Sequence, residues 1–347
     1  MLTCSMLYAY YNINFIQYIK SKKGFVLMEI FSFILLHNIL PIFIVIIVGF
    51  ILGKKFKLDV KTLSKLNFYV FVPSFIFTDL YKSDISFKLM DVILVTALVF
   101  IWNLIIPFII SKVRKHDRDF VGAMTNSISL FNSGNIGIPL ITLVFSSAPF
   151  VIDGKTPYLA LALTCQILIM TFQSIMSNTL GFINAGRATV DLKTAIIKVL
   201  KMPTIYAIAL AFLLKLVPYN LVNIPVWPSL TYMGDALIPV ALITLGIQLS
   251  KTKFKLSNPD VYISNFFRLI ISPIIAIILI YILGLHGVMA EVLVIVLSGP
   301  TAVNAALIAV EYDNHPHFVS QAVFTSTLFC SITMTFAIYI ARILFPV

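Results

Sequence analysis

The sequence predicts an all-α polytopic membrane protein with ten transmembrane helices. Of its 347 residues, 60% are hydrophobic and only 11% are charged, and the mean hydropathy is +1.01. A soluble domain carries roughly a quarter of charged residues, so this chain has too few to cover a soluble surface. Its apolar residues also fall into runs of about 20, the length of helix that crosses a hydrocarbon core of about 30 Å.

Ten apolar runs make up the predicted helices, with ends placed to within several residues. The sixth run is short because Lys215 and Pro218 interrupt it, so nine or eleven helices are the alternatives to ten. The predicted helices cover residues 30–53, 63–80, 89–111, 120–145, 158–183, 202–219, 229–250, 265–285, 288–310 and 318–345.

Lysine and arginine residues gather on alternate loops, and this pattern orients the chain in the cell membrane. Cytoplasmic loops hold the excess of positive charge in membrane proteins. The loops within residues 54–65, 112–118, 187–201 and 251–255 carry 16 of them, against five on the opposite side when residues 1–27 are left out. Both termini are therefore predicted to be extracytoplasmic. The net charge of +11 follows this topology, so nucleic acid is not an expected partner.

The predicted helices divide into two halves of five. Residues 28–185 form the first repeat, residues 186–201 a cytosolic linker, and residues 202–347 the second repeat. Residues 1–27 contain three lysines and lack a clean apolar core with a cleavage site, so they do not resemble a signal peptide. They are interpreted as an N-terminal extension, and Met28 is an alternative start of the chain.

The segment Asn132–Pro139 interrupts the fourth predicted helix with two amides, two glycines and a proline. An unpaired backbone group costs several kcal/mol in hydrocarbon, so irregular backbone persists there only inside protein or beside a cavity. The segment is therefore a candidate binding site.

Similar features recur in the second half of the chain. Pro73 is matched by Pro239, 166 residues later, and Ser133-Gly134 by Ser298-Gly299, 165 residues later. A near-constant offset is expected for two five-helix repeats, and an odd number of helices inverts the second repeat in the membrane. The broken segments near residues 130–139 and 298–304 would then cross near the midplane.

The register of this repeat has an alternative. A shift of several residues would pair Asn132 with Thr301.

The sequence shows no motif for a cofactor, a metal or catalysis. Cys4, Cys165 and Cys330 lack metal-binding spacing and are interpreted as packing residues, and neither a phosphate-binding glycine loop nor His-Glu-x-x-His occurs. Asp235 and Asp313 resemble the aspartate pair of intramembrane proteases, but their motifs stand in reversed order. An intramembrane enzyme is therefore the least favoured class. A non-transporting receptor is another alternative, although such a protein would be expected to carry a soluble signalling domain.

Several short segments in a fixed order carry a family resemblance. They are Asn132-Ser133 with Gly137-Ile138-Pro139, Asp235-Ala236 with Leu245-Gly246, Arg268 with Pro273, Pro300, and Glu311-Tyr312 with His315-Pro316. Together they resemble helices four, seven, eight and nine of the auxin efflux carrier family, which includes plant auxin exporters and bacterial malonate and malate permeases. The resemblance covers roughly residues 28–347.

Two departures separate the chain from the plant members. Phe131 stands before Asn132, where they have a proline, and the connection at residues 184–201 is short where they have a long cytosolic loop. The chain therefore resembles a microbial member, and auxin is not the expected substrate.

The resemblance implies a panel of helices one, two, six and seven beside a core of the other six. It implies that the broken helices four and nine cross, as in bile acid/sodium symporters and NhaA-like antiporters. It also implies a homodimer formed through the panel helices.

Half-helix N-termini at such a crossing suit a carboxylate, because each carries about half a positive charge and unsatisfied N–H donors. Asn132 would add amide donors, the glycines would let the backbone approach the ligand, and the prolines would interrupt the hydrogen-bond ladder. For each residue the alternative is a helix-packing role, which is also the interpretation of Gln166, Gln173 and Asn178. The candidate substrate-binding residues are Asn132, Ser133, Gly134, Asn135, Gly137, Pro139, Ser298, Gly299, Pro300, Thr301 and Asn304.

Three ionisable residues in the predicted helices are candidates for ion coupling or for polar structural roles. Asp91 lies near the outer end of helix three, where it could simply face solvent. Arg268 lies near the inner end of helix eight, where it could reach the headgroups. Asp235 lies at membrane depth in helix seven, where a buried hydrogen-bonded role is the alternative.

These features predict a secondary active transporter that moves a small organic anion, most simply a carboxylate, by alternating access. No cofactor is expected. A sodium- or proton-coupled importer is the alternative, but no adjacent pair of carboxylates lies near the predicted crossing. The membrane potential alone could drive export of an anion, at about 2.3 kcal/mol per charge per 100 mV.

Overall fold

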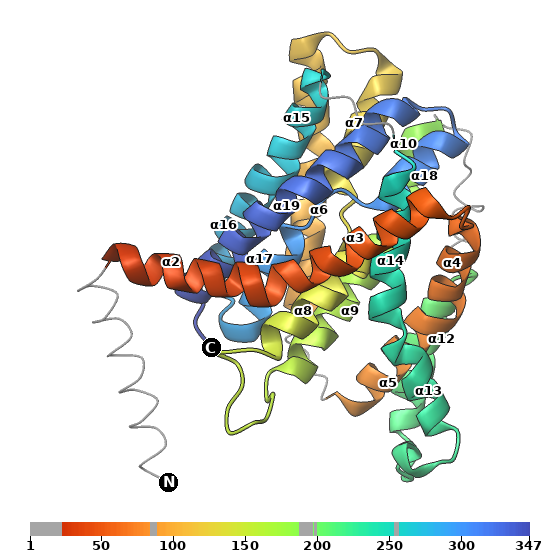
Figure 1. Cartoon of the computed structure of the whole chain (residues 1–347), viewed down its shortest axis with the longest axis vertical. Coiled ribbons are helices and arrows are strands. Elements are labelled where there is room, and N and C mark those ends of the chain that lie inside the picture. The colour runs from red at the N-terminus through yellow and green to blue at the C-terminus, as the bar shows by residue number, and fades with distance from the viewer. Residues whose placement is uncertain (1–22, 84–88, 187–196, 198–199, 253–256) are drawn as a thin grey trace.

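The computed structural model describes residues 23–83, 89–186, 197, 200–252 and 257–347 (Figure 1). Throughout these ranges the regular structure is helical, and extended pairing is limited to two isolated bridges. Most of the predicted N-terminal extension at residues 1–27 and of the predicted linker at residues 186–201 lies outside the described residues.

The helices of the first half include four π-helical segments, named η1 to η4. In chain order they are α2 (Lys23–Ile34), η1 (Leu35–Ile39), α3 (Leu40–Lys55), α4 (Val60–Leu66), η2 (Asn67–Phe71), α5 (Val72–Lys82), α6 (Leu89–Arg114), α7 (Arg118–Ser129), η3 (Ser133–Gly137), α8 (Ile138–Phe145), α9 (Leu159–Met176), η4 (Ser177–Gly181) and α10 (Phe182–Gly186).

The second half contains a 3-10 helix, η5, and a further π-helical segment, η6. In chain order its helices are α12 (Pro203–Lys215), η5 (Leu221–Asn223), α13 (Trp227–Asp235), α14 (Leu237–Ser250), α15 (Pro259–Phe266), η6 (Phe267–Ile271), α16 (Ser272–Ile282), α17 (Gly287–Leu297), α18 (Val303–Glu311) and α19 (Pro316–Leu344).

Six continuous helical stretches among the described residues are long and apolar enough to cross a membrane. They correspond to predicted helices one, three, five, seven, eight and ten, so the class of all-α polytopic membrane protein is confirmed. Three further apolar helices are shorter, at Ser133–Phe145, Pro203–Lys215 and Gly287–Leu297. Two of these belong to predicted helices four and nine, which are short because the chain breaks inside them: α7 ends at Ser129, and α17 ends at Leu297.

Proline explains where most of the π-helical segments lie. Pro41, Pro73, Pro139 and Pro273 each occupy one of the first two positions of the α-helix that follows a π segment. Proline has no N–H and its ring clashes with the carbonyl four residues earlier, so the α-helical ladder cannot run through it unchanged. The wider π turn before each proline is a local solution, and such turns are frequent at functional sites.

One group of helices, here called the panel, consists of α3, α4–η2–α5 and α12–α14. Figure 1 shows α4, α5, α12, α13 and α14 together on its right-hand side, with α3 reaching them from the front. α3 packs along α14, and α12 and α13 pack on α5. A Cβ atom on Gly49 or Gly246 would collide with backbone of the facing helix, at Ile243 and Ile46 respectively. Small residues thus allow α3 and α14 to touch backbone to backbone, as membrane helices often do.

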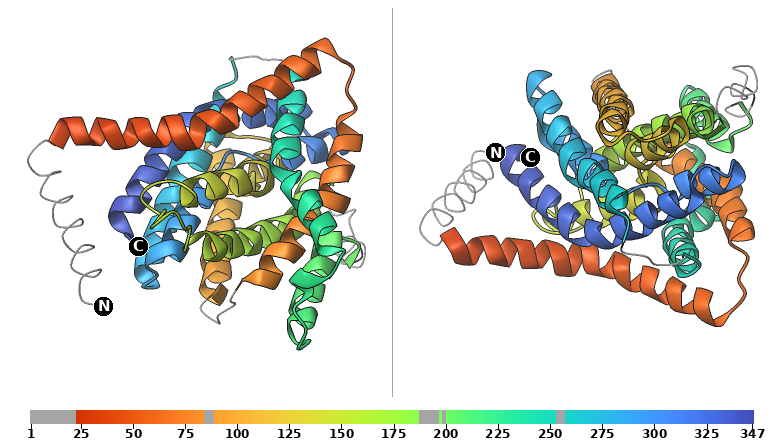
Figure 2. Two further views of the ribbon diagram at one scale, coloured as in Figure 1. Left: turned by 60° about the horizontal axis from the view of Figure 1, so that its bottom comes forward. Right: turned by 90° about the horizontal axis from the view of Figure 1, so that it is seen from above.

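The second group, here called the core group, consists of α6–α10 and α15–α19. α17 lies at its centre, in contact with α6, α8, α9, α16 and α19, and nearly all of its residues are buried. Figure 2 shows α2–η1–α3 running along the outside from the core group to the panel. Phe31 of α2 packs on Phe336 of α19, with ring centroids 4.8 Å apart. The two groups also meet directly, because α14 contacts η3 and α5 contacts α9.

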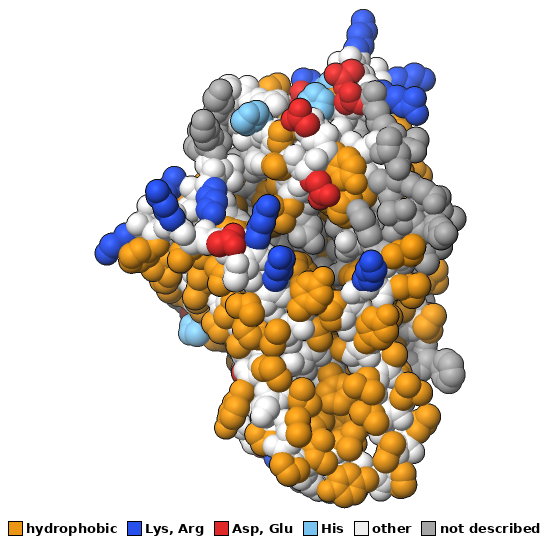
Figure 3. All heavy atoms as spheres, turned by 90° about the vertical axis from the view of Figure 1, so that its right-hand side faces the viewer, with side chains coloured by type: hydrophobic (Ala, Val, Ile, Leu, Met, Phe, Trp, Pro, Cys, Tyr) orange, Lys and Arg blue, Asp and Glu red, His pale blue; other side chains and the backbone are white. Residues whose placement is uncertain are grey.

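Charge and apolar surface are separated on the outside of the panel. Figure 3 shows Lys, Arg, Asp and Glu side chains in the upper part of this face and a broad field of hydrophobic side chains below. α12 contributes Tyr206, Leu210 and Leu213, all exposed. An apolar surface of this extent is rare on soluble proteins and common where lipid covers it. The helix ends that adjoin the lysine-rich loops of the sequence also lie at this charged end of the molecule.

Candidate functional site

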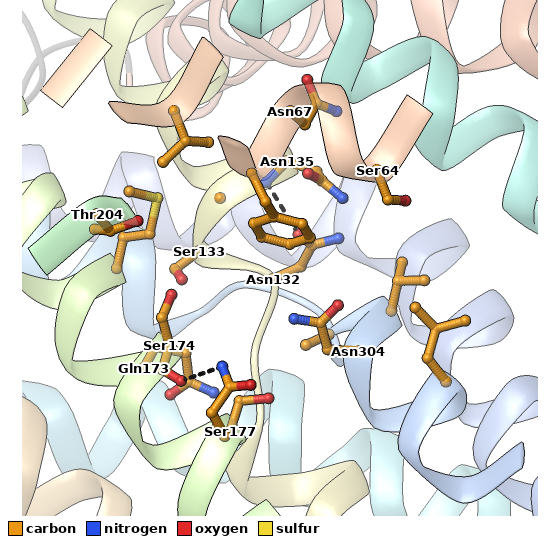
Figure 4. A pocket seen from close by; sticks show the side chains of 18 of the residues that line it. Ser64, Asn67, Asn132, Ser133, Asn135, Gln173, Ser174, Ser177, Thr204 and Asn304 are labelled. Atoms are coloured by element: carbon orange, nitrogen blue, oxygen red, sulfur yellow. Dashed lines mark hydrogen bonds between the residues drawn. The ribbon is translucent and has the colours of Figure 1, made fainter. Parts of the chain in front are cut away.

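A cavity of about 530 Å³ lies between the panel and the core group (Figure 4). About half of the residues that line it have polar side chains, which is unusual inside a membrane protein and marks functional positions. The core group contributes Asn132, Ser133, Asn135, Gln173, Ser174 and Asn304. The panel contributes Asn67, Thr204, Thr244 and Gln248. Exposed Lys201 and Glu311 mark its mouth at the charged end of the molecule.

The cavity adjoins the place where the two interrupted helices meet. Phe131 and Thr301 form an isolated antiparallel bridge there. Two backbone hydrogen bonds of 2.8 Å make this bridge, from the Asn132 N–H to the Pro300 oxygen and from the Ala302 N–H to the Leu130 oxygen. Segments 130–139 and 298–304 are therefore in direct backbone contact, and this contact region is here called the crossing.

The carbonyl groups at the end of α7 are satisfied by other parts of the chain. The Thr301 hydroxyl donates to the Ser127 oxygen at 2.8 Å, and the Gln173 amide donates to the Ser129 oxygen at 3.5 Å. On the other side of the break, the Gln166 amide donates to the Ser133 oxygen at 2.5 Å. Carbonyl groups without hydrogen-bond partners at membrane depth would cost free energy, so these hydrogen bonds stabilise the interrupted helix.

Arg268 joins the ends of both interrupted helices. Its side chain is fully buried, and its guanidinium donates to the Ile128 oxygen of α7 at 3.1 Å and to the Leu297 oxygen of α17. The guanidinium carbon lies 5.1 Å from the centroid of the Phe131 ring, within range of a cation–π interaction. The interpretation that Arg268 reaches the headgroups is therefore wrong, because the crossing supplies buried acceptors for it.

The oxygen and the nitrogen of the Asn132 side-chain amide have different surroundings. Its side-chain oxygen accepts the Asn135 N–H at 3.2 Å and so caps the helix that begins at Ser133. Its amide nitrogen is buried and has no hydrogen-bond partner in the described part of the chain. Only 6% of the residue is exposed, and it lines the cavity beside Asn304, as Figure 4 shows. A buried amide left without a partner is uncommon, and here it offers a donor to a ligand.

The second helix N-terminus at the cavity belongs to α18. Its N-cap residue is Ala302, which offers no side-chain cap, and Val303 and Asn304 both line the cavity. The first N–H groups of a helix lack partners inside the helix, so they attract anions. Two N-termini and one amide donor therefore face the same space.

The structure brings only some of the sequence candidates to the cavity. Asn132, Ser133, Gly134, Asn135 and Asn304 line it. The other six pack around the crossing: Gly137, Pro139, Ser298, Gly299, Pro300 and Thr301. Their positions have physical causes. Ser298 donates its hydroxyl to the Ile295 oxygen at 2.6 Å, and a Cβ on Gly137 would lie 2.6 Å from the Gln166 amide nitrogen.

Sequence reasoning did not propose the panel side of the cavity. Asn67 and Gln248 are amides within or at the end of predicted helices, which is a weak signal for a polar wall. Gln173 and Asn178, interpreted as packing residues, also line the cavity. The side chain of Asp235 is exposed on the surface and does not have the buried role considered for it. Asp91 is also exposed, in the first turn of α6. Neither aspartate lines the cavity, whose described charged residues are Lys201 and Glu311.

An all-helical membrane protein with a polar cavity beside interrupted helices has the architecture of a membrane carrier. Residues 34–338 match the family model described as membrane transport protein, so the chain belongs to this family, and the resemblance to auxin efflux carriers is confirmed.

Two relatives from methanogens are similar over most of their length. An uncharacterized transporter of Methanothermobacter thermautotrophicus is 27% identical over 311 residues, which cover 86% of this chain and 95% of the relative. An uncharacterized transporter of Methanocaldococcus jannaschii is 25% identical over 301 residues, covering 84% and 94%. These names indicate a membrane transporter, a class of protein distinct from enzymes.

Proposed function

We propose that this protein is a secondary active transporter that moves a small organic anion, a carboxylate, across the cell membrane by alternating access. One observation carries the proposal. The buried amide nitrogen of Asn132 has no partner among the described residues and lies at a cavity that two helix N-termini also face. Such a site offers hydrogen-bond donors and about half a positive charge from each helix, which is what a carboxylate requires.

The positions of the two helix breaks support an inverted repeat. The helices that restart after the breaks have Asn132 and Ala302 as their N-cap residues, and these are 170 positions apart, as are Phe131 and Thr301 of the bridge. We infer ten transmembrane segments in two inverted five-helix repeats, residues 28–185 and 202–347, related by a two-fold axis in the membrane plane. This relation favours an offset of 170 residues near the axis, the separation of Phe131 and Thr301, over the offset of 165 read from Ser133 and Ser298.

The position of the cavity supports alternating access. It separates the panel from the core group, and its mouth lies at the end where lysines gather. The positive-inside rule makes this end cytoplasmic and the termini extracytoplasmic. In this conformation the site is open to the cytoplasm, and a shift of the core group against the panel would open it outward.

Counterflow in proteoliposomes tests the proposal. Purified protein is reconstituted with an unlabelled acid inside, and uptake of the labelled acid is followed for malonate, malate, other short carboxylates and indole acetate. We expect accumulation of at least one of them in protein-containing vesicles and none in protein-free vesicles. Failure of every carboxylate to exchange, with correctly folded protein, would reject an organic anion as the substrate.

The same vesicles decide the coupling. We expect a response to voltage and none to sodium or to a pH gradient, because the described residues that line the cavity include no carboxylate pair to exchange such ions. A requirement for sodium or protons would instead favour the coupled importer.

A further inference from the structure

Arg268 is a buried cation that has no carboxylate partner in the part of the chain that the structure describes. Its side chain is 0% exposed, and none of the ion pairs among the described residues involves it. Its hydrogen bonds go to the Ile128 and Leu297 carbonyl oxygens, at the C-terminal ends of α7 and α17. An arginine side chain stays protonated in proteins, so the crossing holds one fixed positive charge.

The charges at the crossing can be added. The C-termini of α7 and α17 carry about half a negative charge each, and Arg268 balances both of them. The N-termini of the helix Ser133–Phe145 and of α18 carry about half a positive charge each, and these remain. The protein groups at the crossing therefore carry a surplus of about one positive charge.

This surplus faces the cavity. Gly134 and Asn135 of one N-terminus and Asn304 of the other line it, together with the unpartnered amide of Asn132. The other described charges on the wall are Lys201 and Glu311, which have opposite signs and lie exposed at the mouth.

Phe131 separates Arg268 from the ligand space. Its ring lines the cavity and lies 5.1 Å from the guanidinium carbon. Arg268 is therefore a positioning residue that acts through the two helix ends and through its field, without touching the ligand.

We propose that Arg268 sets the charge of the site, so that the site selects a singly charged anion over a doubly charged one. The inference rests on the proposed function. A monocarboxylate, or a dicarboxylate with one acid group blocked, neutralises the crossing, whereas a dianion leaves about one uncompensated negative charge in a poorly solvated space.

Binding of a series of ligands that differ in charge, measured at one fixed pH, tests this selectivity for singly charged anions. Binding of malonate and succinate as dianions, their monomethyl esters as monoanions and their dimethyl esters as neutral molecules is measured by calorimetry on the purified full chain. We expect each monoester to bind at least about tenfold more tightly than its parent dianion and than its neutral diester. Dianions that bind more tightly than the monoesters would overturn the inference.

Two substitutions link this preference to the arginine. Arg268→Met keeps the length of the side chain without its charge, and Arg268→Lys keeps the charge. The methionine variant should lose the preference for monoesters over neutral diesters by about tenfold, and the lysine variant should keep it. The ratio between ligands of different charge is the readout, since a purely structural defect would lower all affinities together.

The outcomes separate the two proposals. A methionine variant with an unchanged charge preference overturns the role of Arg268. If it does not fold, the wild-type series and the lysine variant decide. Wild-type protein that binds neither the dianions nor the monoesters would reject the proposed organic-anion site itself, and the inference with it.

Discussion

Phe131 lies opposite Thr301 in an antiparallel bridge at the point where the two interrupted helices meet. The bridge pairs the N–H groups of Asn132 and Ala302 with the Pro300 and Leu130 oxygens, so these four backbone groups at the breaks are satisfied without water. It also holds the N-termini of the following helices beside one cavity. The bridge is thus the feature that turns two helix breaks into one candidate site.

Substituting Asn132 should separate the capping role from the binding role. Asn132→Asp keeps an oxygen that can cap the Asn135 N–H, removes the amide donor and adds negative charge. We expect it to fold with a thermal midpoint near that of the wild type and to lose anion exchange by more than about tenfold. Asn132→Ala should lose the exchange and also about 1 kcal/mol of stability, because the cap is gone. Counterflow and thermal unfolding in detergent measure the two effects.

Asn126→Ala is the matched control for that experiment. Asn126 is a buried amide that donates to the Gly181 oxygen at 2.8 Å, and it does not line the cavity. The control should lower the thermal midpoint and leave the affinity for the exchanged anion unchanged. Wild-type exchange by Asn132→Asp would contradict the assignment of the amide as a ligand donor.

Gly137 and Gln166 should behave as a coupled pair. A Cβ on Gly137 would lie 2.6 Å from the Gln166 amide nitrogen, which donates to the Ser133 oxygen. Gly137→Ala should displace this amide and cost about 1 kcal/mol of unfolding free energy, the worth of the lost hydrogen bond. In a Gln166→Ala background the bond is already absent, so the same substitution should cost little.

A double-mutant cycle, read by thermal unfolding, measures this coupling. Gly134→Ala is the steric control for stability, because its Cβ would meet only the Met170 sulfur at 3.6 Å. Additive effects of the Gly137 and Gln166 substitutions would show that the two residues do not interact.

Solvent access should report the side on which the cavity opens. Leu307 lines the cavity and is 47% exposed, and Ile278 of α16 has the same exposure and does not line it. In a background without Cys4, Cys165 and Cys330, Leu307→Cys should react with an impermeant maleimide from the cytoplasmic side. Ile278→Cys should stay unlabelled because lipid covers it.

The exchanged anion should slow the labelling of Leu307→Cys. Labelling from the extracytoplasmic side alone would reverse the proposed orientation of the chain. Labelling of both variants at equal rates would show that Leu307 does not line a separate aqueous cavity.

The broken helix was predictable because its signal is local. Glycines, amides and a proline within Asn132–Pro139 stand out in an apolar run whatever the rest of the chain does, and the helix stops at Ser129, just before them, and restarts at Ser133 with a π-helical turn. The membrane class was predictable for a similar reason, since it depends on composition and on run length. Five of the eleven candidate residues line the cavity, and all five lie within two residues of the start of a half-helix.

The remaining features depend on how distant helices pack. Asn67 and Gln248 line the cavity because of the rotation of η2 and α14 about their axes, which no local pattern determines. The Arg268 guanidinium donates to buried carbonyl oxygens of residues that lie 140 and 29 positions away in the sequence. The Thr301 hydroxyl likewise donates to the Ser127 oxygen, which is 174 residues away in the sequence, so its role also depends on how the two interrupted helices pack.

Acid should loosen the start of α4 through Asp59. This exposed carboxylate caps α4, and its pKa is lowered mainly by the hydrogen bond from the Thr62 hydroxyl and then by that from the Lys61 N–H. Because the folded pKa lies below the unfolded one, the cap stabilises α4 fully above the unfolded pKa of about 4 and is lost as the pH falls through the folded value.

Hydrogen exchange measures this effect. Exchange at residues 60–66, corrected for intrinsic rates, should accelerate below a pH of about 4 in the wild type. Asp59→Asn keeps a capping oxygen and does not titrate, so its exchange should lack this step. An identical acid response in both proteins would show that another group controls the helix.

We propose that an organic anion binds between Asn132 and the N-terminus of α18. A cryo-EM structure of the full chain with the anion that exchanges in counterflow would locate this anion directly. We expect a carboxylate oxygen about 3 Å from the Asn132 amide nitrogen, facing Asn304. An anion held instead by Lys201 at the cavity mouth, with Asn132 making no contact to it, would show that Asn132 does not bind the substrate.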